Sequence, residues 1–266
     1  MSGGAVPVPH ARDSGPPDAR EAVVLLHGIG GDRALWPDLP LSLAGRRALA
    51  WDQPGYGASD SLPATTFPVL AESLLSLLDV RGVARAHLVG HSMGGMVALE
   101  FAAAHPSRVA SLVLVATSAA FGSRDPAFAR DFLAARLGPL DAGRPMAEVA
   151  EEVAGGALGP DPDPAVRAAL VAAMARTPEA TYRATVGCLV GFDRRDALPG
   201  LAMPTLLVAG AEDRVAPPRG MARMAEAIPG ARGRPLVAIP GAGHFPHLER
   251  PRDFDAALAA FLSTLA

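Results

Sequence analysis

The sequence has 266 residues, of which 50% are hydrophobic and 19% are charged, so it can bury one large core and is not wholly disordered. The formal net charge is −3 and the basic residues form no cluster, which argues against a nucleic-acid-binding protein. Every basic residue is arginine, a bias typical of GC-rich bacterial genomes, and the single cysteine, Cys188, excludes an internal disulfide.

The first 20 residues are polar and rich in proline and glycine, and their pattern predicts no clear strand. They contain no apolar segment of the kind that directs export. No apolar run elsewhere approaches the roughly 20 residues needed to span a bilayer. We therefore expect a soluble, cytoplasmic protein without a membrane partner.

Short apolar runs then alternate with stretches of helical periodicity. The runs are almost continuously hydrophobic, as is typical of strands that are covered by helices on both faces. This alternation predicts an α/β fold with a doubly wound, mostly parallel sheet. The expected strands lie at residues 22–26, 47–51, 86–89, 111–116, 205–209 and 235–239, and the expected helices at 67–78, 94–105, 218–228 and 251–265.

The alternation stops at about residue 122 and resumes at about residue 197. The sequence between is rich in alanine and predicts three or four helices and no strand. A helical insertion between parallel strands lies at their carboxyl ends, where such folds bind ligands. We therefore expect a core formed by residues 1–121 and 197–266, with residues 122–196 as a helical lid. A helical hairpin that serves only stability is the alternative.

The motif GHSMGG at residues 90–95 stands between an expected strand and an expected helix. The pattern G-x-S-x-G requires this context, because it places serine on a sharp strand-to-helix turn. Such a turn strains the serine backbone, and glycines are needed where a β-carbon would collide with neighbouring backbone. The helix amino terminus would stabilise a developing oxyanion. The motif predicts that Ser92 is a nucleophile.

A second glycine-rich loop, HGIGG at residues 27–31, follows the first clear strand. Acyl transfer needs backbone N–H groups that bind the oxyanion, and each contributes roughly 3–4 kcal/mol to lowering the barrier. We assign this oxyanion hole to the N–H groups of Ile29 and Met93. His27 would then brace the loop. An ordinary glycine turn is the alternative interpretation.

A serine hydroxyl needs a base to remove its proton, and seven histidines are available. His244 is favoured because it lies in a glycine-rich loop after the last expected strand, at the sheet edge where this architecture gathers catalytic side chains. His247 is the fallback. His91 adjoins Ser92, but on a sharp turn its side chain should point away. The remaining histidines are expected to be structural or to lie in the tail: His10, His27, His87 and His105.

Asp213 follows the expected strand 205–209 and is predicted to orient the imidazole of His244. Losing such a carboxylate can lower the rate by about 10⁴-fold. Its neighbour Glu212 is expected to be a solvated carboxylate. The chain order Ser, Asp, His differs from the orders in chymotrypsin-like and subtilisin-like enzymes.

Together these segments resemble the α/β-hydrolase superfamily. The most similar branch bears a lid and includes 3-oxoadipate enol-lactonases, meta-cleavage-product hydrolases, cofactor-free haloperoxidases and small carboxylesterases. The resemblance implies the fold and the Ser92–Asp213–His244 triad, and it suggests that Asp52 and Ser59 are structural. The family usually opens with a β-hairpin, for which few residues precede the HG loop here. The matching segments are residues 27–31, 52–60, 90–95, 204–217 and 241–251.

We expect a serine hydrolase that cleaves a small carboxylic ester or lactone through an acyl-enzyme. Serine at position 92 excludes haloalkane dehalogenases and epoxide hydrolases, whose nucleophile is aspartate. Carbon–carbon bond hydrolysis and cofactor-free perhydrolase or haloperoxidase chemistry use the same triad and stay open, as do acyl transfer and a non-enzymatic small-molecule sensor. The HExxH, P-loop and GxGxxG patterns are absent, so no metal or other cofactor is expected.

Apolar side chains in the lid and loops suggest a modest pocket for a small molecule. Each of these side chains is otherwise an ordinary core residue. The oligomeric state is left open by the sequence. The candidate pocket residues are Trp36, Phe121, Phe128, Phe132, Met146, Met174, Phe192 and Phe245.

Overall fold

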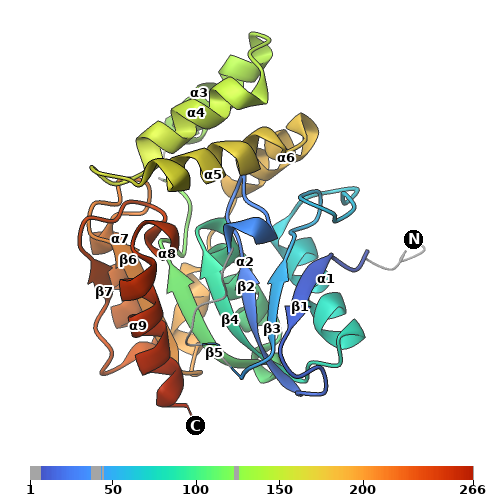
Figure 1. Ribbon diagram of the computed structural model, residues 1–266, viewed down its shortest axis with the longest axis vertical. Helices are drawn as coiled ribbons and strands as arrows, with labels where there is room; N and C mark the ends of the chain where they lie inside the picture. Colours follow the sequence, from blue (N-terminus) through green and yellow to red (C-terminus); the bar gives the residue numbers. More distant parts are fainter. Residues whose placement is uncertain (1–6, 37–42, 44, 123–125, 266) are drawn as a thin grey trace.

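A seven-stranded sheet with the order β1-β3-β2-β4-β5-β6-β7 forms the centre of the molecule (Figure 1). The computed structural model describes residues 7–36, 43, 45–122 and 126–265. β1 runs antiparallel to β3, and the other neighbouring strands are parallel. The strands are β1 (Ala11–Ser14), β2 (Glu21–Leu26), β3 (Ala48–Trp51), β4 (Arg85–His91), β5 (Val109–Val115), β6 (Thr205–Gly210) and β7 (Val237–Ile239).

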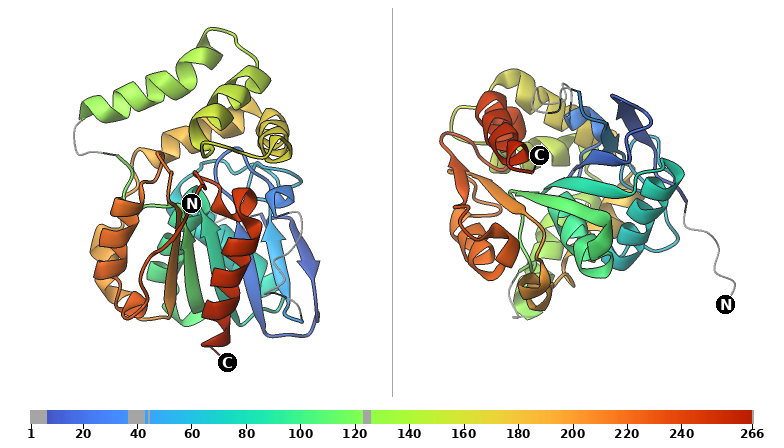
Figure 2. Two further views of the ribbon diagram at one scale, coloured as in Figure 1. Left: turned by 60° about the vertical axis from the view of Figure 1, so that its left-hand side comes forward. Right: turned by 90° about the horizontal axis from the view of Figure 1, so that it is seen from below.

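Helices cover both faces of this sheet (Figures 1 and 2). Successive strand residues point to opposite faces: Val24 packs on the side of α1, α2 and α7, whereas Val23 and Leu25 pack on the side of α9. Each such fully buried side chain contributes roughly 2 kcal/mol to stability. The covering helices are α1 (Phe67–Val80), α2 (Met93–Ala104), α7 (Pro218–Ala227) and α9 (Pro251–Ser263).

A separate layer of helices, here called the cap, lies over one edge of the sheet (Figure 1). It has its own small core, in which Met174 and Tyr182 are buried. An isolated bridge between Ala120 and Asp193 joins the two ends of this insertion. Residues 123–125 of the expected insertion lie outside the described residues. The cap helices are α3 (Pro126–Asp141), α4 (Met146–Ala157), α5 (Pro164–Ala175) and α6 (Glu179–Leu189).

Polar contacts fasten the cap to the loops that follow the sheet. Arg176, at the end of α5, forms an ion pair of 2.8 Å with Asp32. The hydroxyl of Thr181 donates a hydrogen bond of 3.1 Å to the carbonyl of Gly55. The Gly55 loop is itself braced by Asp52, whose buried carboxylate accepts the backbone N–H of Ala58 at 2.9 Å. The cap is therefore anchored on the loops that follow β2 and β3.

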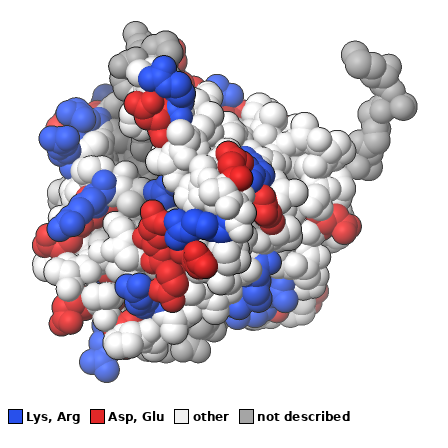
Figure 3. Space-filling model, turned by 90° about the horizontal axis from the view of Figure 1, so that it is seen from above, with Lys and Arg blue, Asp and Glu red and all other residues white. Residues whose placement is uncertain are grey.

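The upper face of the molecule carries acidic and basic side chains side by side (Figure 3). On the cap, Arg144 pairs with Glu148 and Glu152, and Arg183 pairs with Glu179 and Asp141. Such exposed pairs contribute little to stability individually. Within the part of the chain that the structure describes, no helix has both the length and the apolar character needed to cross a membrane.

Candidate active site

Ser92 sits on a strained turn between β4 and α2. Its backbone φ is +52°, in the left-handed region that a non-glycine residue rarely occupies. Hydrogen bonds hold it there: its N–H donates to the carbonyl of Val115 at 2.9 Å, and its own carbonyl accepts the hydroxyl of Thr117 at 2.7 Å. Strain of this kind persists only when surrounding contacts fix it, and it is concentrated at functional sites.

Glycine is required on both sides of Ser92 for reasons of space. A β-carbon at Gly94 would lie 2.2 Å from the carbonyl oxygen of Leu26, and one at Gly90 would lie 2.5 Å from the carbonyl oxygen of Gly94. Both distances are far shorter than any van der Waals contact. The glycines of the motif therefore allow α2 to begin directly against β2 and β4.

Three side chains from three loops lie in a line at this edge. The Nε2 atom of His244 is 2.9 Å from the hydroxyl oxygen of Ser92, and its Nδ1 atom is 2.9 Å from Oδ2 of Asp213. Because a carboxylate only accepts hydrogen bonds, Nδ1 carries the proton and Nε2 presents its lone pair to Ser92. This tautomer is the one that can accept a proton from serine.

The carboxylate of Asp213 is buried and fully hydrogen-bonded. Its Oδ1 atom accepts the backbone N–H groups of Val215 and Ala216 at 2.7 and 2.9 Å. Burial by itself raises the pKa of Asp213, but these bonds and the interaction with His244 outweigh it and hold the pKa below its usual value. Asp213 is therefore a carboxylate at neutral pH, whereas its neighbour Glu212 is exposed to solvent.

Other histidines occupy positions that do not serve Ser92. His27 donates from Nδ1 to the carbonyl of Gly28 at 2.8 Å and accepts the N–H of Gln53 at 3.0 Å, so it braces two loops. His87 bonds to Ser111, His105 bonds to Glu72, and His10 is exposed. His91 points away from the hydroxyl of Ser92 and donates from Nε2 to the carbonyl of His244 at 2.7 Å.

The imidazoles of His91 and His247 are buried close to His244. The ring centroids of His91 and His247 are 4.7 Å apart, and His247 stacks on Trp36 at 4.3 Å. Burial, with the neighbouring His244, lowers the pKa of His247 to about 3. Burial also lowers the pKa of His91 well below its usual value, assisted by His247 and His244. Both rings are therefore neutral at physiological pH.

This arrangement predicts that acid destabilises the protein through His247. In the unfolded chain a histidine binds a proton below a pKa of about 6.5, whereas folded His247 stays neutral down to about pH 3. Lowering the pH from 7 to 5 should therefore remove about 2 kcal/mol of unfolding free energy on account of this ring alone. Urea unfolding at the two pH values measures the loss. The variant His247→Phe keeps a ring on Trp36. Over the same pH change it should lose about 2 kcal/mol less unfolding free energy than the wild type, and an equal loss in the two proteins would contradict the prediction.

The backbone N–H groups predicted to bind an oxyanion belong to Met93, which follows Ser92, and to Ile29, in the loop after β2. Met93 is the first residue of α2, so its N–H has no acceptor within the helix. A β-carbon at Gly28 would lie 2.9 Å from Cβ of Ser92, which places the backbone that leads into Ile29 directly beside the serine. The side chain of Ile29 packs against both the sheet core and the cap core.

The candidate pocket residues separate into three groups. Phe121, Phe128 and Phe132 form one aromatic group, with the rings of Phe121 and Phe132 4.7 Å apart. Phe132, like Ile29, packs against both the sheet core and the cap core. In the cap core, Met174 is buried and Met146 is partly buried. The remaining residues lie elsewhere: Phe245 against His91, Trp36 in the core beside α9, and Phe192 in the core against Phe67.

Trp36 and Phe192 are buried in the clusters that pack on the sheet, and a place for them in a substrate pocket stays a prediction. Only 2% of Trp36 and 4% of Phe192 is exposed. Their apolar character reflects packing against helices that cover the sheet. Ile29 and Phe132 pack against both the sheet core and the cap core, and Phe245 and Leu248 pack against a further cluster that includes the cap residue Leu170.

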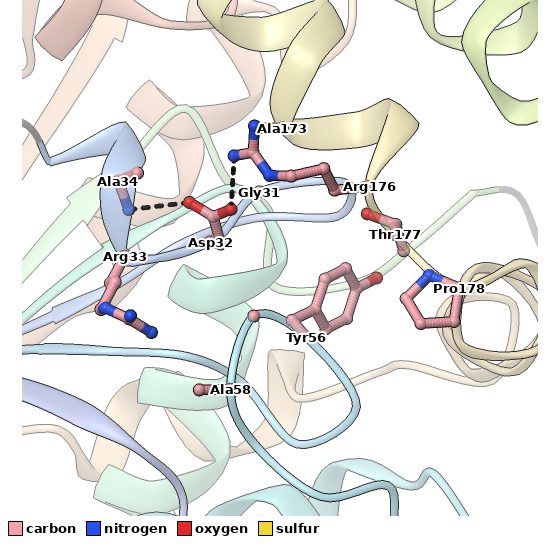
Figure 4. A pocket seen from close by; sticks show the side chains of 11 residues that line it. Gly31, Asp32, Arg33, Ala34, Tyr56, Ala58, Ala173, Arg176, Thr177 and Pro178 are labelled. Carbon is pink, nitrogen blue, oxygen red and sulfur yellow. Dashed lines mark hydrogen bonds and ion pairs between the residues drawn. The ribbon is translucent and has the colours of Figure 1, made fainter.

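A cavity of about 680 Å³ opens between the loop after β2, the Tyr56 loop and the turn from α5 to α6 (Figure 4). The Asp32–Arg176 ion pair crosses its lining, and Asp32 also accepts the N–H of Ala34. Its lining includes none of Ser92, Asp213 and His244. Among the described residues, no three His, Cys, Asp or Glu side chains are grouped so as to hold a metal ion.

The family model described as the alpha/beta hydrolase fold matches residues 21–251. A protein of Variovorax paradoxus strain S110 named as the carbamate hydrolase RutD is 36% identical over 97% of each chain. The structure of a thermophilic esterase from Thermogutta terrifontis has a TM-score of 0.85, with 29% identity over 97% of this chain and 93% of its own. The enol-lactonase from Burkholderia xenovorans LB400 has a TM-score of 0.84, with 26% identity over 96% of each chain. The chain therefore belongs to the α/β-hydrolase superfamily, in the branch that includes esterases and enol-lactonases, and is a hydrolase.

Proposed function

We propose that the chain is a serine hydrolase that cleaves small carboxylic esters or lactones through an acyl-enzyme on Ser92. The observation that carries this proposal is the line from Ser92 through His244 to Asp213, with 2.9 Å at each contact. The imidazole tautomer that Asp213 enforces is the one that general-base catalysis requires.

In the proposed mechanism, His244 takes the proton from Ser92 as the hydroxyl oxygen attacks the carbonyl carbon of the substrate. The N–H groups of Ile29 and Met93 bind the oxyanion, and the partial positive charge at the start of α2 adds to its stabilisation. His244 then protonates the leaving alcohol, or the ring oxygen of a lactone. In the second half, His244 removes a proton from water as the water attacks the acyl-enzyme. The bond between the acyl carbon and Oγ of Ser92 then breaks, His244 returns the proton to Oγ, and the carboxylic acid is released.

A small, mainly apolar acyl group suits the junction between sheet and cap. Ile29 and Phe132 are partly buried against both the sheet core and the cap core, and the ring of Phe121 lies 4.7 Å from that of Phe132. The relatives support a small substrate with a reactive carbonyl, since their names specify a carbamate hydrolase, an esterase and an enol-lactonase. Ester and lactone cleavage require only the groups present in this site.

A substrate panel tests the proposal. Purified protein should hydrolyse short p-nitrophenyl esters or enol-lactones faster than it forms peracid from acetate and peroxide or cleaves a dienoate-type diketone. A fluorophosphonate should modify Ser92, as located by peptide mass spectrometry, and hydrolysis should fall in proportion to the modification. Faster carbon–carbon cleavage or peracid formation would reassign the reaction, and modification elsewhere with full activity would reject Ser92.

A further inference from the structure

The backbone of the loop that carries His244 is hydrogen-bonded to two other parts of the chain. The N–H of His244 donates to the carbonyl of Ala157 at 2.7 Å, and its carbonyl accepts from His91 at 2.7 Å. Ala157 is the last residue of cap helix α4, and His91 precedes Ser92. The backbone of the proposed base is thus bonded both to the cap and to the strand that ends at Ser92.

Glu249 completes this arrangement. The one-turn helix α8 (Pro246–Glu249) returns its side chain beneath the loop, where only 5% of the residue is exposed. Its Oε1 atom accepts the N–H groups of Gly243 and Phe245 at 3.0 and 3.1 Å, and its Oε2 atom accepts the N–H of Gly159 at 2.7 Å. One carboxylate therefore binds the residues on both sides of His244 and a residue of the cap.

The cap segment 157–159 touches this loop backbone to backbone. A β-carbon at Gly159 would lie 2.7 Å from the carbonyl oxygen of Gly241, and one at Gly243 would lie 2.5 Å from the nitrogen of Gly159. Glycine at both positions allows the approach that brings the N–H of Gly159 to Glu249. The same carboxylate therefore links the backbone of the cap to the backbone on both sides of His244.

We propose that Glu249 is a positioning residue of the reaction, which holds His244 in line with Ser92 and couples this alignment to the cap. The proposal rests on the function proposed above. Proton transfer to Nε2 depends on a contact of 2.9 Å, and a misplacement of about 1 Å can lower a rate by about 100-fold. Because the hydrogen bonds that Glu249 accepts come from Gly159, Gly243 and Phe245, its effect on His244 passes through the backbone at residues 243 and 245.

Glu249→Gln distinguishes the hydrogen bonds to the His244 loop from the hydrogen bond to the cap. The amide oxygen of glutamine can accept from Gly243 and Phe245 as Oε1 does, but the NH₂ group then faces the N–H of Gly159 and cannot accept it. This variant should lose the hydrogen bond to Gly159 of the cap and keep the two hydrogen bonds to Gly243 and Phe245 in the loop. Glu249→Ala should lose both.

The expected result is a graded fall in kcat for a p-nitrophenyl ester, about tenfold for Glu249→Gln and about 100-fold for Glu249→Ala, with KM little changed. The far-downfield proton NMR signal of the Nδ1–H between His244 and Asp213 should broaden or shift in the same order. Glu100→Gln is the matched control. Glu100 is equally buried, at 5% exposure, and binds Arg194 through both oxygens. It should lose stability and keep the kcat and the NMR signal of the wild type.

An unchanged kcat and NMR signal in both Glu249 variants would overturn the proposal and leave Glu249 with a structural role. An equal fall in kcat for Glu100→Gln would also overturn it, because general loss of stability would then be the cause. If Glu249→Ala fails to fold, the nearly isosteric glutamine variant carries the test. The NMR signal needs no substrate, so it tests the alignment even if the wild type hydrolyses no ester.

Discussion

Ser92→Ala should lower kcat/KM for a p-nitrophenyl ester by at least about 10⁴-fold, since the variant has no atom that can form the acyl-enzyme. The bonds that fix the turn should survive, because they involve the backbone of residue 92 and the side chain of Thr117. Only the hydrogen bond to His244 is removed, at a cost of about 1 kcal/mol. Thermal unfolding should therefore shift by only a few degrees.

A second serine provides the control for this experiment. Ser76 on α1 donates its hydroxyl to the carbonyl of Glu72 and touches no part of the site. Ser76→Ala should keep wild-type activity and a similar unfolding midpoint. Residual hydrolysis above about 1% in Ser92→Ala, free of wild-type contamination, would mean that another group carries the acyl transfer.

The sheet could be predicted from sequence because of how it is buried. Strands covered on both faces need apolar residues at nearly every position, and the apolar runs at 22–26 and 205–209 correspond to β2 and β6 within one residue at either end. The helix expected at 67–78 is likewise α1, extended to Val80. The α/β fold class and the superfamily are both confirmed.

β1 was not predicted, and its composition explains why. The strand reads Ala-Arg-Asp-Ser and contains no apolar run. It exists because β3 offers an unpaired edge, along which Ala11 pairs with Trp51 and Ser14 with Ala48. Pairing of this kind depends on a partner more than 30 residues away and leaves no local pattern in the sequence. Within the described residues, β1 stands in place of the hairpin with which the family usually begins.

The residues of the candidate site also differed in whether the sequence could identify them. Ser92, Asp213 and His244 were identifiable because each follows a predicted strand, and parallel strands end at a common edge. The contacts of Glu249 and His91 were not identifiable, because they join backbone groups to side chains that are distant in the sequence. The contact between His91 and His244 spans 153 positions. The place of Trp36 and Phe192 in a pocket stays a prediction for a related reason: both side chains are buried in the core, and apolar character does not say which surface covers a residue.

Asp213→Asn should lower kcat by about 10⁴-fold while leaving the shape of the site intact. The amide oxygen of asparagine would remain with the N–H groups of Val215 and Ala216, which only donate. Its NH₂ group would then face Nδ1 of His244 and donate to it. The imidazole proton would move to Nε2, where it faces the hydroxyl of Ser92, so His244 could no longer accept the serine proton.

Glu212→Gln is the matched control, because it makes the same chemical change on the adjacent, exposed carboxylate. Its activity should equal that of the wild type.

The stability of the two variants should also differ with pH. The pKa of Asp213 is lowered in the folded state, so its carboxylate contributes stability above the unfolded pKa of about 3.9 and loses it as the pH falls through the folded pKa. Asp213→Asn should therefore be less stable than the wild type at pH 7, and the difference in unfolding free energy between the two proteins should narrow below pH 4.

A loss of activity shared equally by Glu212→Gln would show that the charge of this loop, and not the orientation of His244, is what the reaction requires.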